Sequence, residues 1–363
     1  MSDGLNLIVA TRLSRHGVVL TFVLACMSLC SCGAGPAKTS TGPPPTFDFF
    51  RMVDAIDNPL TVQYAYAPSI VLKDNVYHIF FCSGGNIFPA WDYIRYVEST
   101  DGGQTWSTPV DKLHATAFNG MDLSACDPSV VYFGGFYYMY YGSAITTAPN
   151  VFQTVIQVAR STNLAGPYLT YTQRSTWEDT PDDPQVIIRP LVTRTQQPSG
   201  YGAGQPSVVA LNGKLLMWYT DDSLSVGPPG DFSTFRLFML ESSDAVTWTP
   251  DANRQTNIEG QDSPDVKYDS SGNRFVATWV LNMFSTTPSL VRAFSSDGLT
   301  WAPQETVIGA GSFPPFTNNA GATADEMGHL VPSRAIVGFG RPYSQSDIDN
   351  GRFDLDGVFL DAP

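Results

Sequence analysis

Charged side chains are scarce in this sequence. They make up 15% of its 363 residues, against roughly 25% in an ordinary soluble domain. Basic residues are the scarcer kind, with 20 Lys and Arg against 34 Asp and Glu, which gives a formal net charge of −14. A chain of this sign repels the phosphate backbone, so nucleic acid is excluded as a partner. Aromatic residues reach 12%, which argues against a disordered chain.

Long apolar runs are also missing, apart from one short stretch near the N-terminus. Residues 17–31 are apolar and follow the basic residues Arg12 and Arg15. A run of roughly 15 residues is too short to span a bilayer and is typical of a secretory signal. Leu29-Cys30-Ser31-Cys32 resembles a bacterial lipobox, which implies cleavage before Cys32 and lipidation of that residue. The alternatives are the similar motif that ends at Cys26 and a plain signal peptide.

The N-terminal motif predicts both the domain boundaries and the location of the protein. We expect a signal peptide in residues 1–31, a Pro- and Gly-rich lipidated tether in residues 32–46, and a single domain in residues 47–363. The protein is then an outer-membrane or cell-surface lipoprotein that touches the membrane only through its lipid. A periplasmic or secreted protein is the alternative.

Cysteine is rare in the expected domain, where Cys82 and Cys126 are the two present. An exported protein meets an oxidising compartment, so these two residues can form a disulfide. Two separate buried thiols are the alternative. Neither cysteine has the spacing of a metal site, and we expect no cofactor; a calcium ion in a central channel is the alternative.

A short pattern recurs along the chain: a residue pair ending in Pro, a few strand residues, a tight turn, and an aromatic-rich strand. Its prolines are Pro68, Pro128, Pro206 and Pro264, separated by 60, 78 and 58 residues. A degenerate fifth copy starts near Gly321. The intervening Asn-Gly and Gly-Gly turns favour hairpins, because these residues tolerate positive φ.

A second pattern follows each hairpin and has the form of an Asp-box, Ser-x-Asp followed by Trp. It occurs in residues 99–106, 242–248 and 295–301, and residues 161–168 take its place after the second hairpin. The Asp or Asn side chain accepts backbone N–H bonds in a turn, and the aromatic ring fills the space between strands. These segments therefore predict structure rather than a functional site.

Together the two patterns predict four strands in each of five units, that is, an all-β fold of the five-bladed β-propeller type. The repeat steps are too long for a seven-bladed propeller, whose units have roughly 40–45 residues. Residues 47–53 are apolar and are expected to supply the outer strand of the last unit, which closes the ring and removes an exposed edge.

Three segments resemble the five-bladed glycoside hydrolases of family 43, which include arabinanases, arabinofuranosidases and xylosidases. They are Asp127-Pro128-Ser129-Val130-Val131, residues 137–142 (Tyr-Tyr-Met-Tyr-Tyr-Gly) and residues 161–168. The resemblance covers roughly residues 58–360, and the Asp-boxes also resemble those of sialidases. It implies a base Asp in the first unit, a pKa-tuning Asp in the second and an acid Glu in the third. This chain has Ala67, Asp127 and Gln205 at those places.

The propeller geometry predicts that the residue before each repeated Pro faces a central pocket: Ala67, Asp127, Gln205 and Ser263. Hydrolysis of a glycoside requires two carboxyl groups. We therefore take Asp127, Asp262 and Asp222 as the candidate catalytic residues, with Asp265 also close by; solvated loop carboxylates or turn caps are the alternative.

Other side chains near the predicted pocket are candidates for binding substrate. The candidate substrate-binding residues are Gln205, Arg341, Tyr66 and Trp91. Cys82 and Cys126 fall near the same end of neighbouring units, which favours their pairing. The leading hypothesis is an exported, monomeric glycoside hydrolase that acts on an oligo- or polysaccharide, and the resemblance favours glycans that contain pentose. A glycan-binding propeller without catalysis and a scaffold in a surface complex are the alternatives.

Overall fold

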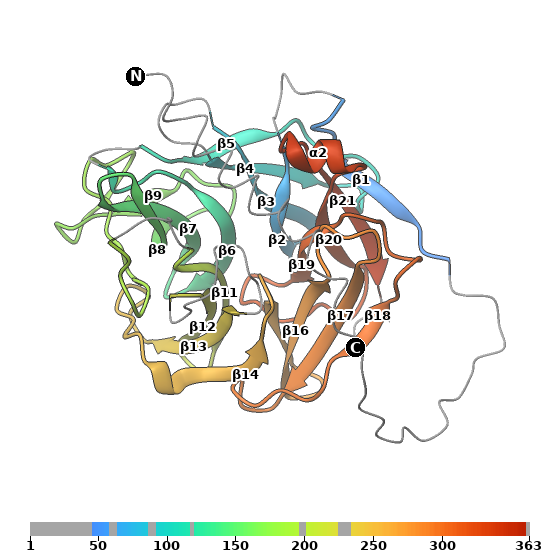
Figure 1. Cartoon of the computed structure of the whole chain (residues 1–363). Helices are drawn as coiled ribbons and strands as arrows, with labels where there is room; N and C mark the ends of the chain where they lie inside the picture. The colour runs from blue at the N-terminus through green and yellow to red at the C-terminus, as the bar shows by residue number, and fades with distance from the viewer. Residues whose placement is uncertain are drawn as a thin grey trace, which may run out of the picture.

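The computed structural model describes residues 46–57, 64–85, 92–116, 120–195, 201–223 and 234–360. Nearly all of its regular structure is β-strand, and one short helix, α2 (Gln345–Asp349), lies near the C-terminus (Figure 1). Within these residues no helix is long and apolar enough to cross a membrane.

The strands form antiparallel groups that follow one another along the chain. The first group is β2 (Tyr66–Lys73), β3 (Val76–Gly84), β4 (Asp92–Ser99) and β5 (Val110–His114). The second is β6 (Cys126–Phe133), β7 (Phe136–Ala148), β8 (Val151–Ser161), β9 (Leu169–Tyr171) and β10 (Trp177–Glu178). The third is β11 (Ala203–Leu211), β12 (Lys214–Asp221), β13 (Arg236–Ser242) and β14 (Gln255–Glu259), beside the 3₁₀ turn η4 (Ala252–Arg254). The fourth is β15 (Asp265–Asp269), β16 (Arg274–Leu281), β17 (Ser289–Ser295) and β18 (Glu305–Ile308).

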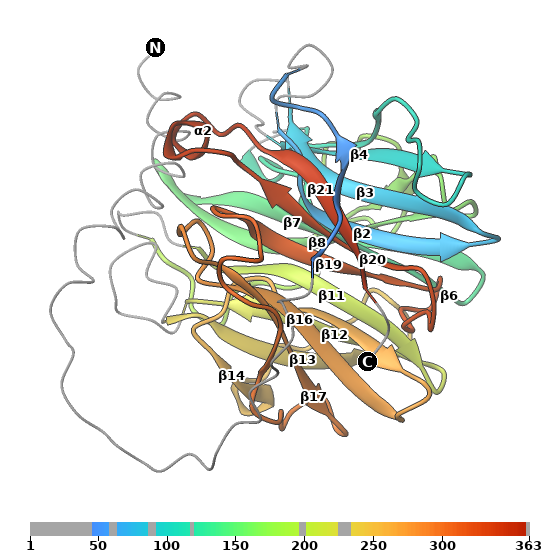
Figure 2. The ribbon, with the colours of Figure 1, turned by 90° about the vertical axis from the view of Figure 1, so that its right-hand side faces the viewer.

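The last group combines the two ends of the domain. It contains β19 (Asn318–Ala324), β20 (Ala335–Arg341), β21 (Asp354–Leu360) and, on its outer edge, β1 (Phe49–Val53). The predicted outer strand in residues 47–53 is therefore present. A short parallel pairing, Thr323 with Ile70 and Ala324 with Val71, joins β19 to β2. The last and first groups thus form one eight-stranded sheet (Figure 2).

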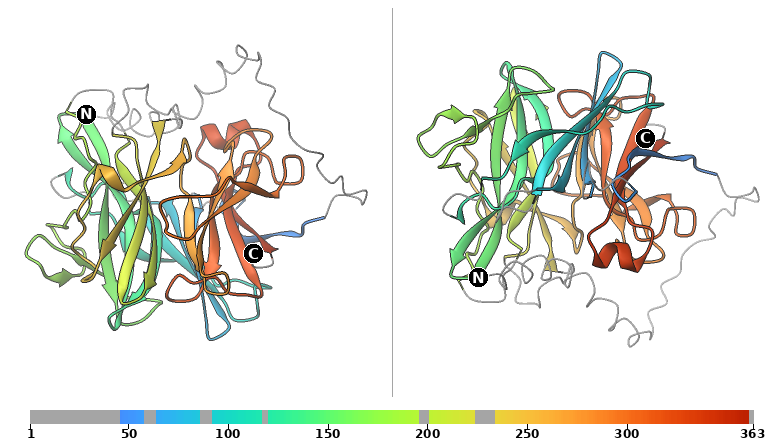
Figure 3. Two further views of the ribbon diagram at one scale, coloured as in Figure 1. Left: turned by 90° about the horizontal axis from the view of Figure 1, so that it is seen from below. Right: turned by 90° about the horizontal axis from the view of Figure 1, so that it is seen from above.

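The hydrophobic core lies between successive groups rather than at one centre. One cluster packs Tyr140 of the second group with Trp248 of the third, and another packs Trp218 of the third with Trp279 of the fourth. A further cluster joins Ile336 of the last group to the first. Because every group packs on the next and the last packs on the first, the groups close a ring (Figure 1), which Figure 3 shows from the side.

The serine of the repeated Pro-Ser pair links neighbouring groups at the centre of the ring. The serine hydroxyl accepts a hydrogen bond from a backbone N–H in the next group. The donor is the valine that lies two residues after the repeated proline of that group. The pairs are Ser69 with Val130 (3.1 Å), Ser129 with Val208 (3.0 Å) and Ser207 with Val266 (2.8 Å). In the fourth group Asp265 replaces the serine and accepts from the N–H of Ala322 at 2.7 Å. The repeat thus encodes the contact that holds the ring together.

Gly321 occupies the serine position in the last group, where the ring closes. A Cβ there would lie 1.9 Å from the backbone oxygen of Pro68. Glycine therefore allows the last and first strands to approach closely. The fifth repeat begins with Asn319-Ala320-Gly321, so Ala320 stands where the other copies have proline.

The loop between β19 and β20 crosses the far end of the innermost strands. The backbone oxygens of Glu326, Met327 and Gly328 accept N–H bonds from the second, third and fourth groups in turn. The donors are Tyr132 (2.6 Å), Ala210 (2.9 Å) and Tyr268 (3.1 Å). A Cβ on Gly328 would lie 2.9 Å from the oxygen of Val208. This loop ties the groups together at the end opposite the repeated prolines.

The Asp turns after the hairpins have the hydrogen bonds that the sequence predicts. The Asp101 carboxylate accepts from the N–H groups of Gln104 and Thr105 and from the Thr105 hydroxyl. Asp244 and Asp297 accept the same kinds of bond. The hydrogen bonds from Thr105 hold the pKa of Asp101 well below its usual range. These carboxylates are therefore structural.

Candidate functional site

A narrow pocket lies at the centre of the ring, where the innermost strands begin; we call it the axial pocket. Its volume is about 40 Å³, and it is lined by Ala67, Pro68, Asp127, Pro128, Gln205, Pro206, Ser207, Ser263, Pro264, Asp265, Asn319 and Ala320. The four residues before the repeated prolines face this pocket, as expected. A space of this size holds a few water molecules rather than a sugar ring.

All five innermost strands enter the pocket with the same unusual backbone. The residue that faces the pocket has positive φ in each group: 50° at Ala67, 50° at Asp127, 53° at Gln205, 54° at Ser263 and 34° at Asn319. In the first three groups the strand register also shifts here, as in a β-bulge. Positive φ disfavours a residue other than glycine, and here it turns one side chain of each group towards the axis.

Sequence reasoning missed Asn319 because the fifth copy lacks the Pro-Ser pair. Asn319 donates from its amide to the Ser263 hydroxyl at 2.5 Å, and Gln205 accepts from the N–H of Ser263 at 3.1 Å. The side-chain oxygen of Gln205 therefore links the third and fourth groups. The side-chain nitrogen of Gln205 remains available to donate a hydrogen bond to a ligand.

Asp127 is a half-buried carboxylate that lines the axial pocket. The preceding residue, Cys126, forms a disulfide with Cys82 that joins the second group to the first. The Cys126 sulfur lies 3.5 Å from a carboxylate oxygen of Asp127 and 3.1 Å from the Tyr66 hydroxyl. The disulfide thus fixes the chain directly before Asp127.

Asp265 also lines the axial pocket, but its oxygens hold the ring together. One oxygen accepts from the Ser207 hydroxyl at 3.0 Å and from Lys267 at 2.6 Å, and the other accepts the N–H of Ala322. A carboxylate with this many donors is well suited to a structural role.

Of the other two candidate catalytic carboxylates, Asp262 lies beside the pocket. It is half-buried and accepts from the hydroxyl of Ser263, which lines the pocket, at 3.3 Å. Asp222 is buried and is not among the lining residues. Its neighbour Asp221 accepts N–H bonds from Leu191 and Ser223.

The candidate substrate-binding residues are distributed unevenly. Gln205 lines the axial pocket, whereas Arg341 binds Asp356 at 2.8 Å and lies over the ring of Tyr343. Tyr66 packs against Tyr64 and Phe353, with ring centroids 5.7 and 5.9 Å away. Trp91 and the predicted lipidation site Cys32 lie outside the described residues.

Two buried acids, Asp122 and Asp92, had no signal in the sequence. Asp122 accepts from the N–H and hydroxyl of Thr116 and from the Ser143 hydroxyl, and burial raises its pKa to about 6. Asp92 accepts from the hydroxyl of Ser124 at 2.7 Å and from that of Tyr64.

Asp92 also lies close to both cysteine sulfurs. Across the described ranges, Cys82, Asp92 and Cys126 form the one group compact enough to hold a metal. Because its sulfurs are bonded to each other, this donor set does not suit a metal ion.

Comparison with solved structures relates this architecture to known enzymes. A family 117 glycoside hydrolase from Zobellia galactanivorans has a TM-score of 0.59 at 12% identity, over 87% of this chain and 91% of that chain. The catalytic domain of a GH62 α-L-arabinofuranosidase from Coprinopsis cinerea has a TM-score of 0.56 at 12% identity, over 86% and 97%. An endo-arabinase from Bacteroides thetaiotaomicron has a TM-score of 0.51 at 16% identity, over 83% and 95%.

The chain shares the fold of known glycoside hydrolases. No protein-family model and no curated protein sequence matches it. Since identities of this size establish the fold alone, the activity has to be argued from the site.

Proposed function

We propose that this protein is a five-bladed β-propeller and an exported glycoside hydrolase that acts on an oligo- or polysaccharide, for which pentose-containing glycans are the first candidates. The observation that carries the proposal is Asp127, a half-buried carboxylate at the centre of a fold shared with glycoside hydrolases. The five positive-φ positions around the axis support the five-bladed architecture.

Asp127 and Asp262 are the carboxyl groups to which we assign the reaction. One carboxyl group protonates the leaving oxygen, and the other activates water or attacks the sugar. Asp127 lines the axial pocket, and Asp262 contacts Ser263 at its edge. Because the pocket itself is narrow, the sugar lies over its opening, where both carboxylates are half-buried.

A glycan-binding propeller without hydrolysis is the second candidate. Two observations favour it: Ala67 stands where the resemblance implies a base, and Gln205 stands where it implies an acid. The carboxylate of Asp265 is also fully engaged with three neighbouring donors. Hydrolysis and binding must therefore be measured separately.

The test is a hydrolysis screen on arabinan, xylan and their oligosaccharides, with purified wild type, Asp127→Asn and Asp262→Asn. Asp182→Asn is the matched control, since Asp182 is exposed and belongs to a surface ion-pair group. We expect product from wild type and the control, and a loss of about a hundredfold or more in the two site variants. Binding without turnover in all four proteins would select the second candidate.

Export and anchoring through Cys32 are part of the proposal. Incorporation of labelled fatty acid by wild type but not by Cys32→Ser would support lipidation there. Labelling that is lost in Cys26→Ser instead would move the anchor to the alternative motif. A single species at the monomer mass is the expected solution state.

A further inference from the structure

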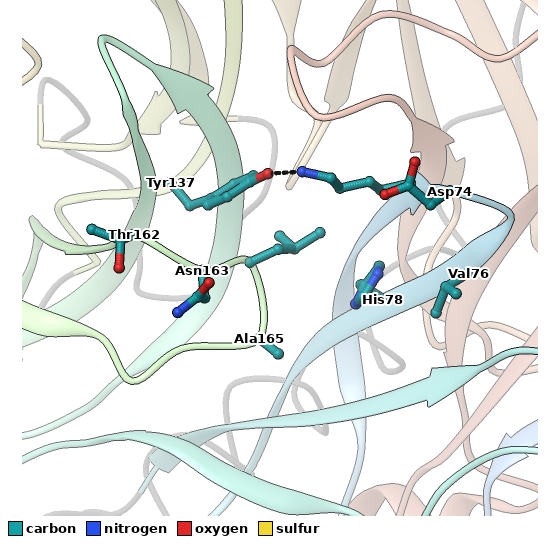
Figure 4. A pocket seen from close by; sticks show the side chains of 9 residues that line it. Asp74, Val76, His78, Tyr137, Thr162, Asn163 and Ala165 are labelled. Carbon is teal, nitrogen blue, oxygen red and sulfur yellow. Dashed lines mark hydrogen bonds between the residues drawn. The ribbon is translucent and has the colours of Figure 1, made fainter.

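A second and larger cavity lies between the first and second strand groups, at the hairpin end of β2 and β3. Its volume is about 370 Å³, within the range of ligand sites. Figure 4 shows side chains from both groups around it: Asp74, Val76 and His78 on one side, Tyr137 and Asn163 on the other. It shares no lining residue with the axial pocket.

Asn163 departs from the repeat at this cavity. The equivalent residues Asp101, Asp244 and Asp297 use their side chains to bind backbone N–H groups in their turns. The turn at Asn163 is closed by the backbone, because the N–H of Gly166 donates to the backbone carbonyl oxygen of Asn163 at 3.0 Å. The exposed side-chain amide of Asn163 has no hydrogen-bond partner in the described part of the chain and lines the cavity, so it can both donate to a ligand and accept from one.

His78 adds an acceptor to the same cavity. The Tyr96 hydroxyl donates to Glu98 at 2.5 Å, because a carboxylate can only accept. His78 Nδ1, 2.6 Å from the Tyr96 oxygen, must then donate to it, which leaves Nε2 as an acceptor. Burial lowers the pKa of His78, which keeps the ring neutral.

The charged groups at this cavity are one cation and two anions, Lys73, Glu326 and Asp74. Lys73 forms an ion pair with Glu326 at 2.7 Å and bonds the Tyr137 hydroxyl. Exposed Asp74 adds a negative charge, which disfavours an anionic ligand. The lining therefore offers mainly acceptors for a neutral ligand that brings hydroxyl donors, with Leu164, Ala165 and Val76 available for its carbon–hydrogen faces.

We propose that this cavity is a second saccharide site, which binds a neutral oligosaccharide through Asn163, His78 and Asp74. It rests on the proposed function for its ligand class, but it does not use the axial carboxylates. Such a site would hold the protein on a polymeric glycan while the axial opening engages another part of the chain.

The test is calorimetric titration of xylotriose and arabinotriose into the Asp127→Asn/Asp262→Asn protein, in which hydrolysis is removed. Adding Asn163→Ala is expected to weaken binding at the second site about tenfold, from loss of the amide hydrogen bonds. Adding Ala165→Trp fills the cavity and should abolish that binding. Gln104→Ala is the matched control, because it removes an exposed amide from the equivalent turn of the first group.

The proposal is overturned if the parent protein binds neither trisaccharide, or if both cavity variants bind as the parent does. It is also overturned if ethylammonium or inorganic phosphate binds in a manner sensitive to Asn163 while the saccharides do not. Binding that is sensitive to Asn163, together with no hydrolysis by wild type, would support this site and reject only the enzyme activity. Hydrolysis by wild type without that binding would reject only this site.

Discussion

Replacing Gly321 by alanine tests whether ring closure depends on close contact between the first and last strands. The new Cβ would lie 1.9 Å from the Pro68 oxygen, so the strands must separate by about 1 Å even to reach 3.0 Å. The pairing of Thr323 with Ile70 and of Ala324 with Val71 lies next to this point. The substitution should therefore weaken the one direct sheet connection between the last and first groups.

The magnitude follows from two contributions. Overpacking a tight site costs about 1–3 kcal/mol, and loosening two backbone hydrogen bonds costs about 1 kcal/mol each. Together they predict a loss of about 3–5 kcal/mol in the free energy of unfolding. Gly309→Ala is the matched control: neither glycine has positive φ, and the nearest atom to a Cβ on Gly309 is 3.9 Å away. The control should be neutral or stabilised by up to about 1 kcal/mol.

Thermal unfolding followed by circular dichroism measures the difference. With an unfolding entropy of about 2.1 cal/mol/K per residue, a domain of about 315 residues shifts its melting temperature by about 1.5 °C per kcal/mol. Gly321→Ala should therefore melt roughly 5–8 °C below wild type, and Gly309→Ala should not. If both variants melt at the wild-type temperature, the role given to Gly321 is refuted. A melting temperature lowered equally in both would mean that loss of glycine, rather than the contact with Pro68, is responsible.

Three further predictions concern the loop that crosses the ring, a buried acid and the disulfide. Gly328→Ala should destabilise more than Gly213→Ala by about 1–3 kcal/mol in urea unfolding, because both have positive φ but only Gly328 meets backbone within 3 Å; equal losses would contradict this. Asp122 has a pKa of about 6 in the fold against 3.8 when exposed. Its contribution to the free energy of unfolding is therefore complete below pH 4, and that free energy falls by about 3 kcal/mol as the pH rises through 6. Asp122→Asn should flatten that part of the pH–stability curve, and an unchanged slope would reject the assignment. Cys82→Ala/Cys126→Ala should cost about 2–5 kcal/mol, and mass spectrometry should find both thiols protected from alkylation until a reductant is added.

Much of the strand order could be predicted because its signals are local. Tight turns, aromatic-rich strands and the Asp turns act within a few residues, so each hairpin could be placed independently of the others. The repeated Pro-Ser pair marked the innermost strands for the same reason. The fifth copy was located less well, because ring closure requires glycine in place of serine and so removes the repeated motif itself.

The carboxylates were harder to interpret from sequence. Asp127 was correctly expected to face the axis because its neighbours in the chain position it. Asp265 was noted as a further carboxylate near the pocket, but its partners Ser207 and Ala322 lie 58 and 57 residues away in the chain. A carboxylate with a structural role and a carboxylate that contacts a ligand can both lie beside a repeated proline, so the local sequence does not distinguish them.

Four features follow from the sequence alone: the all-β class, the repeated hairpins, the residues that point at the axis and the two cysteines available to pair. They depend on backbone preferences and on turn residues, which a short segment carries within itself. Which polar groups meet depends instead on the tertiary structure, as in the link from each serine to the next group, the loop that crosses the far end, and the cavity beside Asn163. Those contacts arise when strands far apart in the chain close the ring, so their partners cannot be found in any single segment.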